Sequence, residues 1–279
     1  MKKKYLVLGS EGQVGLALVK YLKEQGHIVY EFDIARNEKE DLRIYNINRD
    51  LNFYLSESDF VFFLAFDVGG STYLKKYQNT YEFISNNVKI MNNVFDLLRL
   101  YENKFIFTSS QMSNMNYSSY GTLKALGEYY TKALNGLIVK FWNVYGIEQD
   151  PTKTHVITDF ILKAKNYRCI DMLTDGTEMR QFLYAEDACE ALYLLSENYA
   201  EVPRDEELHI TSFKWNTVSE VAHVIANYFQ ETLIKIPYVK DTVQMDKRNE
   251  PDSFIKRYWQ PKTSIEEGIA KIIKDMEKK

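Results

Sequence analysis

The sequence has little cysteine, histidine or proline and no long apolar run. Its two cysteines, Cys169 and Cys189, do not form a C-x-x-C pair, which excludes a disulfide scaffold and a zinc ribbon. The four histidines are scattered without an H-E-x-x-H motif, so we expect no metal site. No apolar run reaches the roughly 18 residues that a membrane span requires. After the basic start only residues 5–8 are apolar, which is too short for a signal peptide. We therefore expect a cytoplasmic protein with no membrane partner.

No sign of charge dominates the chain. Lys and Arg total 35 against 39 Asp and Glu, which gives a formal net charge of −4. This mild acidity argues against a nucleic-acid partner. Hydrophobic residues make up 45% and charged residues 27%, so the composition is that of an ordinary globular protein and not of a disordered or fibrous one.

The first 150 residues alternate short apolar runs with helical patterns. We expect strands at 5–9, 28–33, 60–66, 104–109 and 136–144, and helices at 14–25, 82–101 and 119–134. Strands that alternate with helices of this length predict an α/β fold, with a doubly wound parallel sheet and right-handed crossovers.

The pattern loosens after residue 150. Expected strands at 170–173, 182–184, 207–211 and 233–239 mix with expected helices at 156–166, 185–197, 217–229 and 264–277. Four of the five prolines lie beyond residue 200. We predict a Rossmann-type domain over 1–150 and a smaller mixed α/β part over 151–279, with a segment near 180–200 crossing back to the first domain.

A glycine motif joins the first expected strand to the first expected helix. Gly9, Gly12 and Gly15 form G-x-x-G-x-x-G, which lets the chain turn tightly and brings a phosphate close to the N-terminus of the helix. Asp33 ends the next strand, 18 residues beyond Gly15, where a carboxylate contacts the adenosine ribose and repels a 2′-phosphate. The motif predicts NAD in preference to NADP. Arg36 lies three residues beyond Asp33, and its positive charge leaves open a weaker preference for NAD over NADP.

A second motif places two ionisable side chains on one helix face. Tyr120 and Lys124 form Y-x-x-x-K, and residues i and i+4 of a helix are neighbours. A lysine beside a tyrosine favours the phenolate, so we expect it to lower the pKa of Tyr120 and fit it for proton transfer from a hydroxyl. The preceding strand ends in Thr108, Ser109 and Ser110, and we expect Ser110 to hold a substrate oxygen.

With these motifs the chain resembles the extended short-chain dehydrogenases/reductases, in particular the NAD-dependent nucleotide-sugar epimerase/dehydratase family. The resemblance extends to the loop at 143–146 and to 175–182, which is similar to the family's D-G-x-x-x-R-D-F. It implies an NAD-binding domain over 1–150 and a nucleotide-sugar-binding part over 151–279. The catalytic residues it implies are Tyr120, Lys124 and Ser110. The cofactor-binding residues it implies are Gly9, Glu11, Gly12, Gln13, Val14, Gly15, Asp33, Asp41, Leu42, Leu64, Ala65, Phe66, Asn87, Ser109, Tyr120 and Lys124. The substrate-binding residues it implies are Gly69, Gly70, Ser110, Gln111, Asn143, Arg180 and Arg248.

The departures from the family narrow the expected reaction. The 4,6-dehydratases carry an Asp-Glu pair where this chain has Gln111 and Met112, neither of which can move a proton. Lys153 and His155 follow the loop at 143–146 and are alternative bases. With Tyr120 as the acid/base, we expect hydride exchange at the sugar 4-position, by a 4-epimerase, 4-dehydrogenase or 4-ketoreductase. The segment at 67–70 resembles one that lies near the sugar in family enzymes acting on GDP-mannose, and it points to a GDP-manno-type hexose. The short spacing from Ser110 to Tyr120 predicts an open sugar pocket, which points to a larger sugar such as a heptose.

Two further expectations concern the whole molecule. The helix at 82–101 carries apolar residues on more than one face, and the family pairs this helix across a two-fold axis, so we expect a homodimer. The alternative function is a non-catalytic NAD-binding regulator of the same fold, although such proteins usually lack the tyrosine or the lysine.

Overall fold

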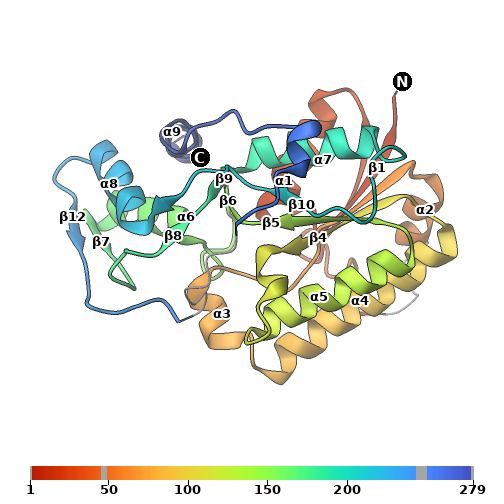
Figure 1. The fold of residues 1–279 in the computed structure, drawn as a ribbon, viewed down its shortest axis with the longest axis horizontal. Coiled ribbons are helices and arrows are strands. Elements are labelled where there is room, and N and C mark those ends of the chain that lie inside the picture. The colour runs from red at the N-terminus through yellow and green to blue at the C-terminus, as the bar shows by residue number, and fades with distance from the viewer. Residues whose placement is uncertain (1, 45–48, 243–249, 278–279) are drawn as a thin grey trace.

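A parallel sheet forms the centre of the molecule (Figure 1). The computed structural model describes residues 2–44, 49–242 and 250–277. The strands follow the order β10-β5-β4-β3-β1-β2, and every pair is parallel. Their bounds are β1 (Lys4–Leu8), β2 (Ile28–Phe32), β3 (Phe60–Phe63), β4 (Phe105–Ser110), β5 (Leu137–Phe141) and β10 (Leu208–Ile210).

Helices cover both faces of this sheet because its strands are apolar on both sides. In β1, Tyr5 and Val7 pack into a core shared with two helices, and Leu6 and Leu8 into a core on the opposite face. The first core contains α1 (Gln13–Glu24) and α7 (Ala185–Glu197), and the second contains α2 (Arg49–Glu57), α4 (Tyr81–Tyr101) and α5 (Ser119–Ala133). The predicted α/β, doubly wound fold is confirmed.

The strand order reverses beside β1. From β1 the chain moves to β2 on one side and then returns to β3 on the other. Ligands of such sheets bind outside the carboxyl ends of the strands at this reversal. The order therefore places a binding crevice beyond Leu8 and Phe63.

A third core lies apart from the sheet and holds the C-terminal elements together. Figure 1 shows these elements beside one end of the sheet. They are α6 (Val156–Tyr167), α8 (Val218–Tyr228), α9 (Ile265–Glu277), and the short strand pairs β7 (Cys169–Asp171) with β12 (Leu233–Lys235), β8 (Met179–Arg180) with β11 (Asn216–Thr217), and β6 (Asn143–Tyr145) with β9 (Phe182–Tyr184).

Three features differ from the expected elements. The strand expected at 136–144 divides at Trp142, because β6 leaves the central sheet to pair with β9. The strand expected within 207–211 is β10, at the edge of the central sheet, because its apolar side chains pack beside β5. Helices α2 and α3 (Ser71–Tyr77) occupy segments with no expected element. Helix α7 and strand β10 come after residue 150 in the chain, yet both pack on the first domain. The division at residue 150 therefore does not separate the two parts completely, and it stays a prediction.

Among the described residues, no helix combines the length and apolarity that a membrane crossing requires.

Candidate active site

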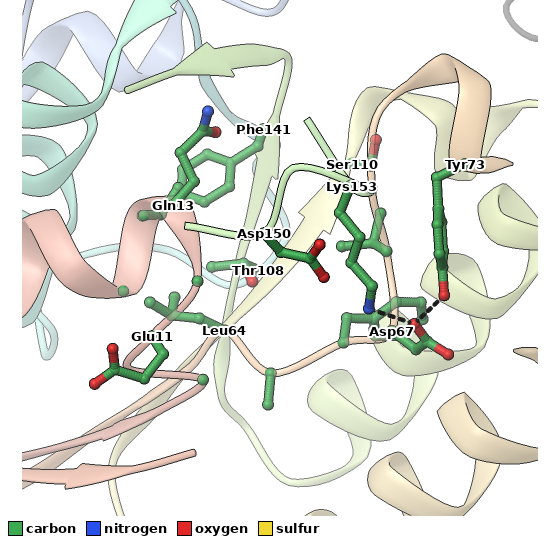
Figure 2. A pocket seen from close by; sticks show the side chains of 18 of the residues that line it. Glu11, Gln13, Leu64, Asp67, Tyr73, Thr108, Ser110, Phe141, Asp150 and Lys153 are labelled. Atoms are coloured by element: carbon green, nitrogen blue, oxygen red, sulfur yellow. Dashed lines mark hydrogen bonds and ion pairs between the residues drawn. The ribbon is translucent and has the colours of Figure 1, made fainter. Parts of the chain in front are cut away.

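A cavity of about 680 Å³ opens at the carboxyl ends of β1, β3 and β4. Figure 2 shows Glu11 and Gln13 on one side of it and Asp67, Tyr73 and Lys153 on the other. Its volume is within the usual range for small-molecule sites. The glycine motif, the Y-x-x-x-K pair and the loop after β6 all contribute to its lining.

The glycine turn has no space for side chains at two positions. Gly9 has a φ of 87°, and a Cβ on it would lie 2.7 Å from the backbone nitrogen of Ala65. A Cβ on Gly15 would lie 2.0 Å from the carbonyl oxygen of Gly9. Gly12 caps α1 without a side-chain acceptor, and the first turn carries no acidic residue. The helix N-terminus therefore faces the cavity with a favourable field for a pyrophosphate, which fits a dinucleotide.

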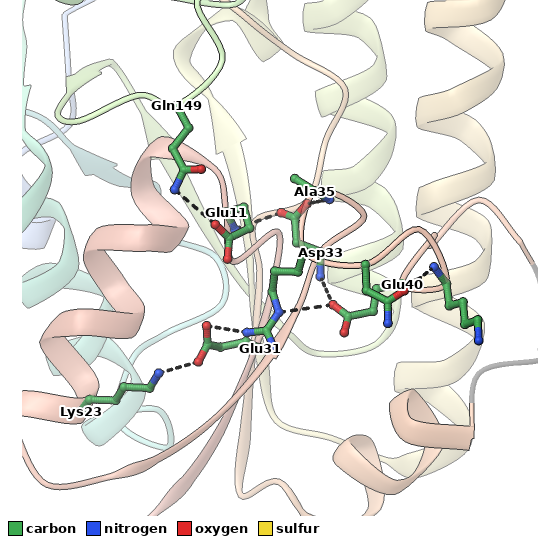
Figure 3. Close-up of polar contacts among 10 residues, drawn as sticks. Glu11, Lys23, Glu31, Asp33, Ala35, Glu40 and Gln149 are labelled. Atoms are coloured by element: carbon green, nitrogen blue, oxygen red, sulfur yellow. Dashed lines mark hydrogen bonds and ion pairs between the residues drawn. The ribbon is translucent and has the colours of Figure 1, made fainter. Parts of the chain in front are cut away.

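Asp33 lies at the end of β2 among other carboxylates (Figure 3). Its Oδ2 accepts from the Glu11 amide at 3.0 Å, and its own amide donates to Glu40 at 2.9 Å. Arg36 donates to Glu31 at 2.7 Å and lies 3.6 Å from Glu40. Arg36 is thus neutralised by two carboxylates, so it offers little to a 2′-phosphate.

We expect at least about tenfold tighter binding of NAD than of NADP, because this cluster repels the additional phosphate. In the double variant Asp33→Ser/Glu40→Gln the preference should fall, since two carboxylates are lost and Arg36 keeps only Glu31 as a partner. Calorimetric titration of the unchanged protein and of the double variant, each with NAD and with NADP, measures the ratio of the two affinities. An unchanged ratio in the double variant would contradict this account of the cluster.

Tyr120 and Lys124 lie on the buried face of α5 and line the cavity. The hydroxyl of Ser118 caps this helix by accepting from the Gly121 amide at 3.1 Å. The Lys124 Nζ donates to the Thr108 carbonyl at 2.7 Å and lies 3.8 Å from the centre of the Phe66 ring. These contacts fix the lysine where the carboxyl end of β4 meets the cavity.

Burial decides the protonation of both groups. It raises the pKa of Tyr120 to about 12, although a hydrogen bond with Ser110 lowers it. It lowers the pKa of Lys124 to about 7, although the Glu128 carboxylate raises it. The expectation that Lys124 lowers the pKa of Tyr120 is wrong for this structure. Its ammonium lies over aromatic rings, 5.9 Å from the centre of the Tyr120 ring, and desolvation outweighs any attraction at that distance.

Most of the predicted site residues line the cavity. All of the predicted catalytic and cofactor-binding residues do so except Asn87. Of the predicted substrate-binding residues, those that line it are Gly69, Gly70, Ser110, Gln111 and Asn143. The Oδ1 of Asn143 is buried without a hydrogen-bond partner. Their contacts with cofactor and substrate stay predictions.

Two of the predicted residues within the described chain, Asn87 and Arg180, do not line the cavity. Asn87 is fully buried and accepts from the Asp67 amide at 2.7 Å, so it supports the site from behind. Arg180 pairs with Asp241, with Nη2 2.5 Å from Oδ2. Arg248 lies outside the described residues.

The far wall of the cavity holds a polar network that connects two loops. There the Asp67 carboxylate accepts from Tyr73 at 2.7 Å and from Lys153 at 2.9 Å (Figure 2). In the loop that carries Lys153, His155 Nδ1 lies 2.6 Å from Oε1 of Glu148. Both Lys153 and His155, the alternative bases, therefore line the cavity. No periodic pattern marks this loop, so only the polar run between two elements could have indicated it.

Asp67 should make stability depend on pH. Burial alone would raise its pKa, but the Tyr73 and Lys153 hydrogen bonds outweigh burial and lower it. A depressed folded-state pKa stabilises the native state above the unfolded value of about 4, and this contribution is lost as pH falls through the folded value. We expect Asp67→Asn to lower Tm by about 3–6 °C at pH 7, with the difference shrinking below about pH 4. Calorimetry of Asp67→Asn across pH measures this Tm difference, and Asp96→Asn, which removes an exposed carboxylate, is the control. A Tm difference for Asp67→Asn that stays constant with pH would contradict the prediction.

Comparisons with known proteins agree with this geometry. Residues 5–211 match the model of the NAD dependent epimerase/dehydratase family. A GDP-L-fucose synthase of Sinorhizobium fredii is 27% identical over 96% of this chain and 94% of its own. A UDP-N-acetyl-alpha-D-glucosaminuronate decarboxylase of Bacillus cytotoxicus is 25% identical over 86% of this chain and 85% of its own.

The fold is also found among solved structures. The epimerase Mth375 of Methanothermobacter thermautotrophicus has a TM-score of 0.82 at 20% identity, over 99% of this chain and 93% of that one. At this identity the likeness concerns the fold alone. Because the family model spans well over half of the sequence, the resemblance inferred from the motifs is confirmed. The chain belongs to the NAD dependent epimerase/dehydratase family, and it is an enzyme whose cofactor is NAD.

Proposed function

We propose that this enzyme transfers a hydride at the 4-position of a nucleotide-diphosphate sugar, with Tyr120 as its acid/base. The observation that carries the proposal is that Tyr120, Ser110 and Lys124 line the same cavity as the glycine turn and Asp33. The substrate class is supported by the relatives, whose names contain a GDP-sugar and a UDP-sugar.

The role that we propose for each residue follows from its position in the cavity. When bound, NAD supplies a hydride acceptor. Tyr120 removes the proton of the sugar hydroxyl, and Ser110 holds the same oxygen by a hydrogen bond. Lys124 holds the nicotinamide ribose. Since burial keeps the phenol protonated without ligand, we expect Tyr120 to lose its proton only when cofactor and sugar are both bound.

The reaction is a 4-epimerisation, a 4-dehydrogenation or a 4-ketoreduction. Sugar dehydration is not supported, because Gln111 and Met112 line the cavity where a proton-shuttling pair would be needed. The GDP-L-fucose synthase relative supports a GDP-sugar, which agrees with the GDP part of the expected GDP-manno-type hexose. The short segment after Ser110 supports a heptose as a second candidate.

A panel of UDP-, GDP- and dTDP-sugars tests the proposal. The protein with NAD is incubated with each sugar while the NADH absorbance and the product stereochemistry are followed. A 4-epimer without net NADH indicates an epimerase, and NADH with a 4-ketosugar indicates a dehydrogenase. For ketoreduction, 4-ketosugars are supplied with NADH. The absence of any turnover with every sugar contradicts the proposal and favours the regulator alternative.

We also propose that the enzyme is cytoplasmic and homodimeric. Its two cysteines are unpaired, as in a reducing compartment. Most apolar residues of α4 pack inside the protein, so the dimer rests on exposed side chains of α4 and α5, namely Tyr81, Ile84, Leu126 and Tyr129. Light scattering of the protein and of Leu126→Asp tests this, with a dimer expected for the first and weakened association for the second.

A further inference from the structure

Three ionisable residues follow one another along one side of α5. Tyr120, Lys124 and Glu128 are spaced by four residues, so each lies one helical turn beyond the last. The first two line the cavity, whereas Glu128 does not. Glu128 therefore stands behind the lysine, away from any ligand in the cavity.

Contacts from two strands hold the Glu128 carboxylate. Its Oε1 accepts from the Ser109 hydroxyl at 2.5 Å, and its Oε2 lies 3.7 Å from the Lys140 ammonium. Ser109 and Lys140 are register partners in β4 and β5. Ser109 is buried, and the Lys140 side chain is 4% exposed, so a loose surface pair is excluded.

A second carboxylate satisfies Lys140. The Lys140 Nζ donates to Glu207 at 2.7 Å and to Asn114 at 3.3 Å. Glu207 is half-exposed and also lies 2.7 Å from Nε2 of His209. The sequence of charges from the cavity to the surface thus alternates in sign, from Lys124 through Glu128 and Lys140 to Glu207.

We propose that Glu128 is a positioning residue of this enzyme, whose fixed carboxylate keeps the Lys124 ammonium charged beside Tyr120. The inference rests on the proposed function through the role of Lys124. It gives Ser109, which donates its hydroxyl to Glu128, the part of holding that carboxylate.

The reason lies in the cost of burying an ammonium. Desolvation favours the neutral amine, and the pKa of Lys124 is lowered to about 7 even with Glu128 present. The other charged groups here are Lys140 and Glu207, with His209 at the outer end. Of the two carboxylates along this row, Glu128 lies one helical turn from Lys124 and raises the pKa of Lys124, so its loss should release the Lys124 proton at lower pH.

Titration of Lys124 tests the inference without any turnover. Isotope-labelled lysine side chains of the full-length protein are followed by NMR across pH, and Lys124→Arg identifies the signal. We expect Glu128→Gln to lower the midpoint by about one pH unit, a tenfold change in the proton equilibrium. Lys140→Met should raise the midpoint, because it removes a positive charge from the same row.

The opposite signs separate an electrostatic role from a structural one. Midpoints that both fall, or an unchanged midpoint in Glu128→Gln, overturn the inference. If Glu128→Gln does not fold, Lys140→Met alone decides, and the absence of a rise overturns it.

A second measurement connects the titration to the reaction. The alkaline limb of the turnover profile should move toward lower pH in Glu128→Gln. If no nucleotide sugar is turned over, the proposed function fails, but the titration still decides the role of Glu128.

Discussion

Replacing Tyr120 by phenylalanine should lower turnover by at least about a hundredfold, because it removes the proton-transfer group of the proposed reaction. The ring is buried and packs edge-on against Phe66, with 5.8 Å between ring centres. Phenylalanine keeps this packing and loses only the hydroxyl. We therefore expect Tm and NAD affinity to change little.

Steady-state kinetics with the sugar identified in the panel measure this effect. Tyr129→Phe is the matched control, since Tyr129 lies on the same helix with its ring exposed. The control should retain full turnover. Near-normal turnover in Tyr120→Phe would remove Tyr120 from the mechanism, whatever the fold of the variant.

Replacing Gly15 by alanine should damage both stability and cofactor binding. The added methyl group would lie 2.0 Å from the Gly9 carbonyl oxygen and 2.9 Å from two Ser10 backbone atoms. Backbone atoms cannot rotate away, so the turn between β1 and α1 must open. Overpacking of this kind costs about 1–3 kcal/mol or more, and we expect Tm to fall by about 5 °C.

NAD affinity should fall at least about tenfold in Gly15→Ala, because the displaced helix N-terminus no longer faces the pyrophosphate. Gly12→Ala is the control for stability, since its nearest contact would be Gly9 O at an ordinary 3.4 Å. Thermal unfolding and NAD titration of both variants test the prediction. Equal unfolding midpoints for Gly15→Ala and the unchanged protein would show that the turn tolerates the methyl group.

Much of the first domain could be predicted because its signals are local. The apolar run at the start of the chain, the three glycines and Asp33 lie within 33 residues, and each has a meaning that its neighbours fix. The Y-x-x-x-K spacing predicts a shared face from the helical period alone. Two short helices, α2 and α3, escaped prediction because nine and seven residues make too few turns to show a clear helical period.

Other contacts, in the site and beside it, depend on residues far apart in the chain. Asp67 and Lys153 are 86 residues apart, and Arg180 meets Asp241 across 61. No spacing rule connects such pairs. The strand expected at 136–144 divides for a similar reason, because β6 pairs with β9 from a later segment.

The sequence by itself determined the parallel sheet, the glycine turn and the placement of Tyr120 and Lys124 on one helix face, since these follow from local spacing and side-chain chemistry. The tertiary structure alone decided how those groups are charged and which carboxylates surround them. It raised the pKa of Tyr120 where the motif suggested a lower one. The physical reason is that desolvation and Coulomb attraction depend on burial and distance, and both arise only when segments remote in the chain pack together.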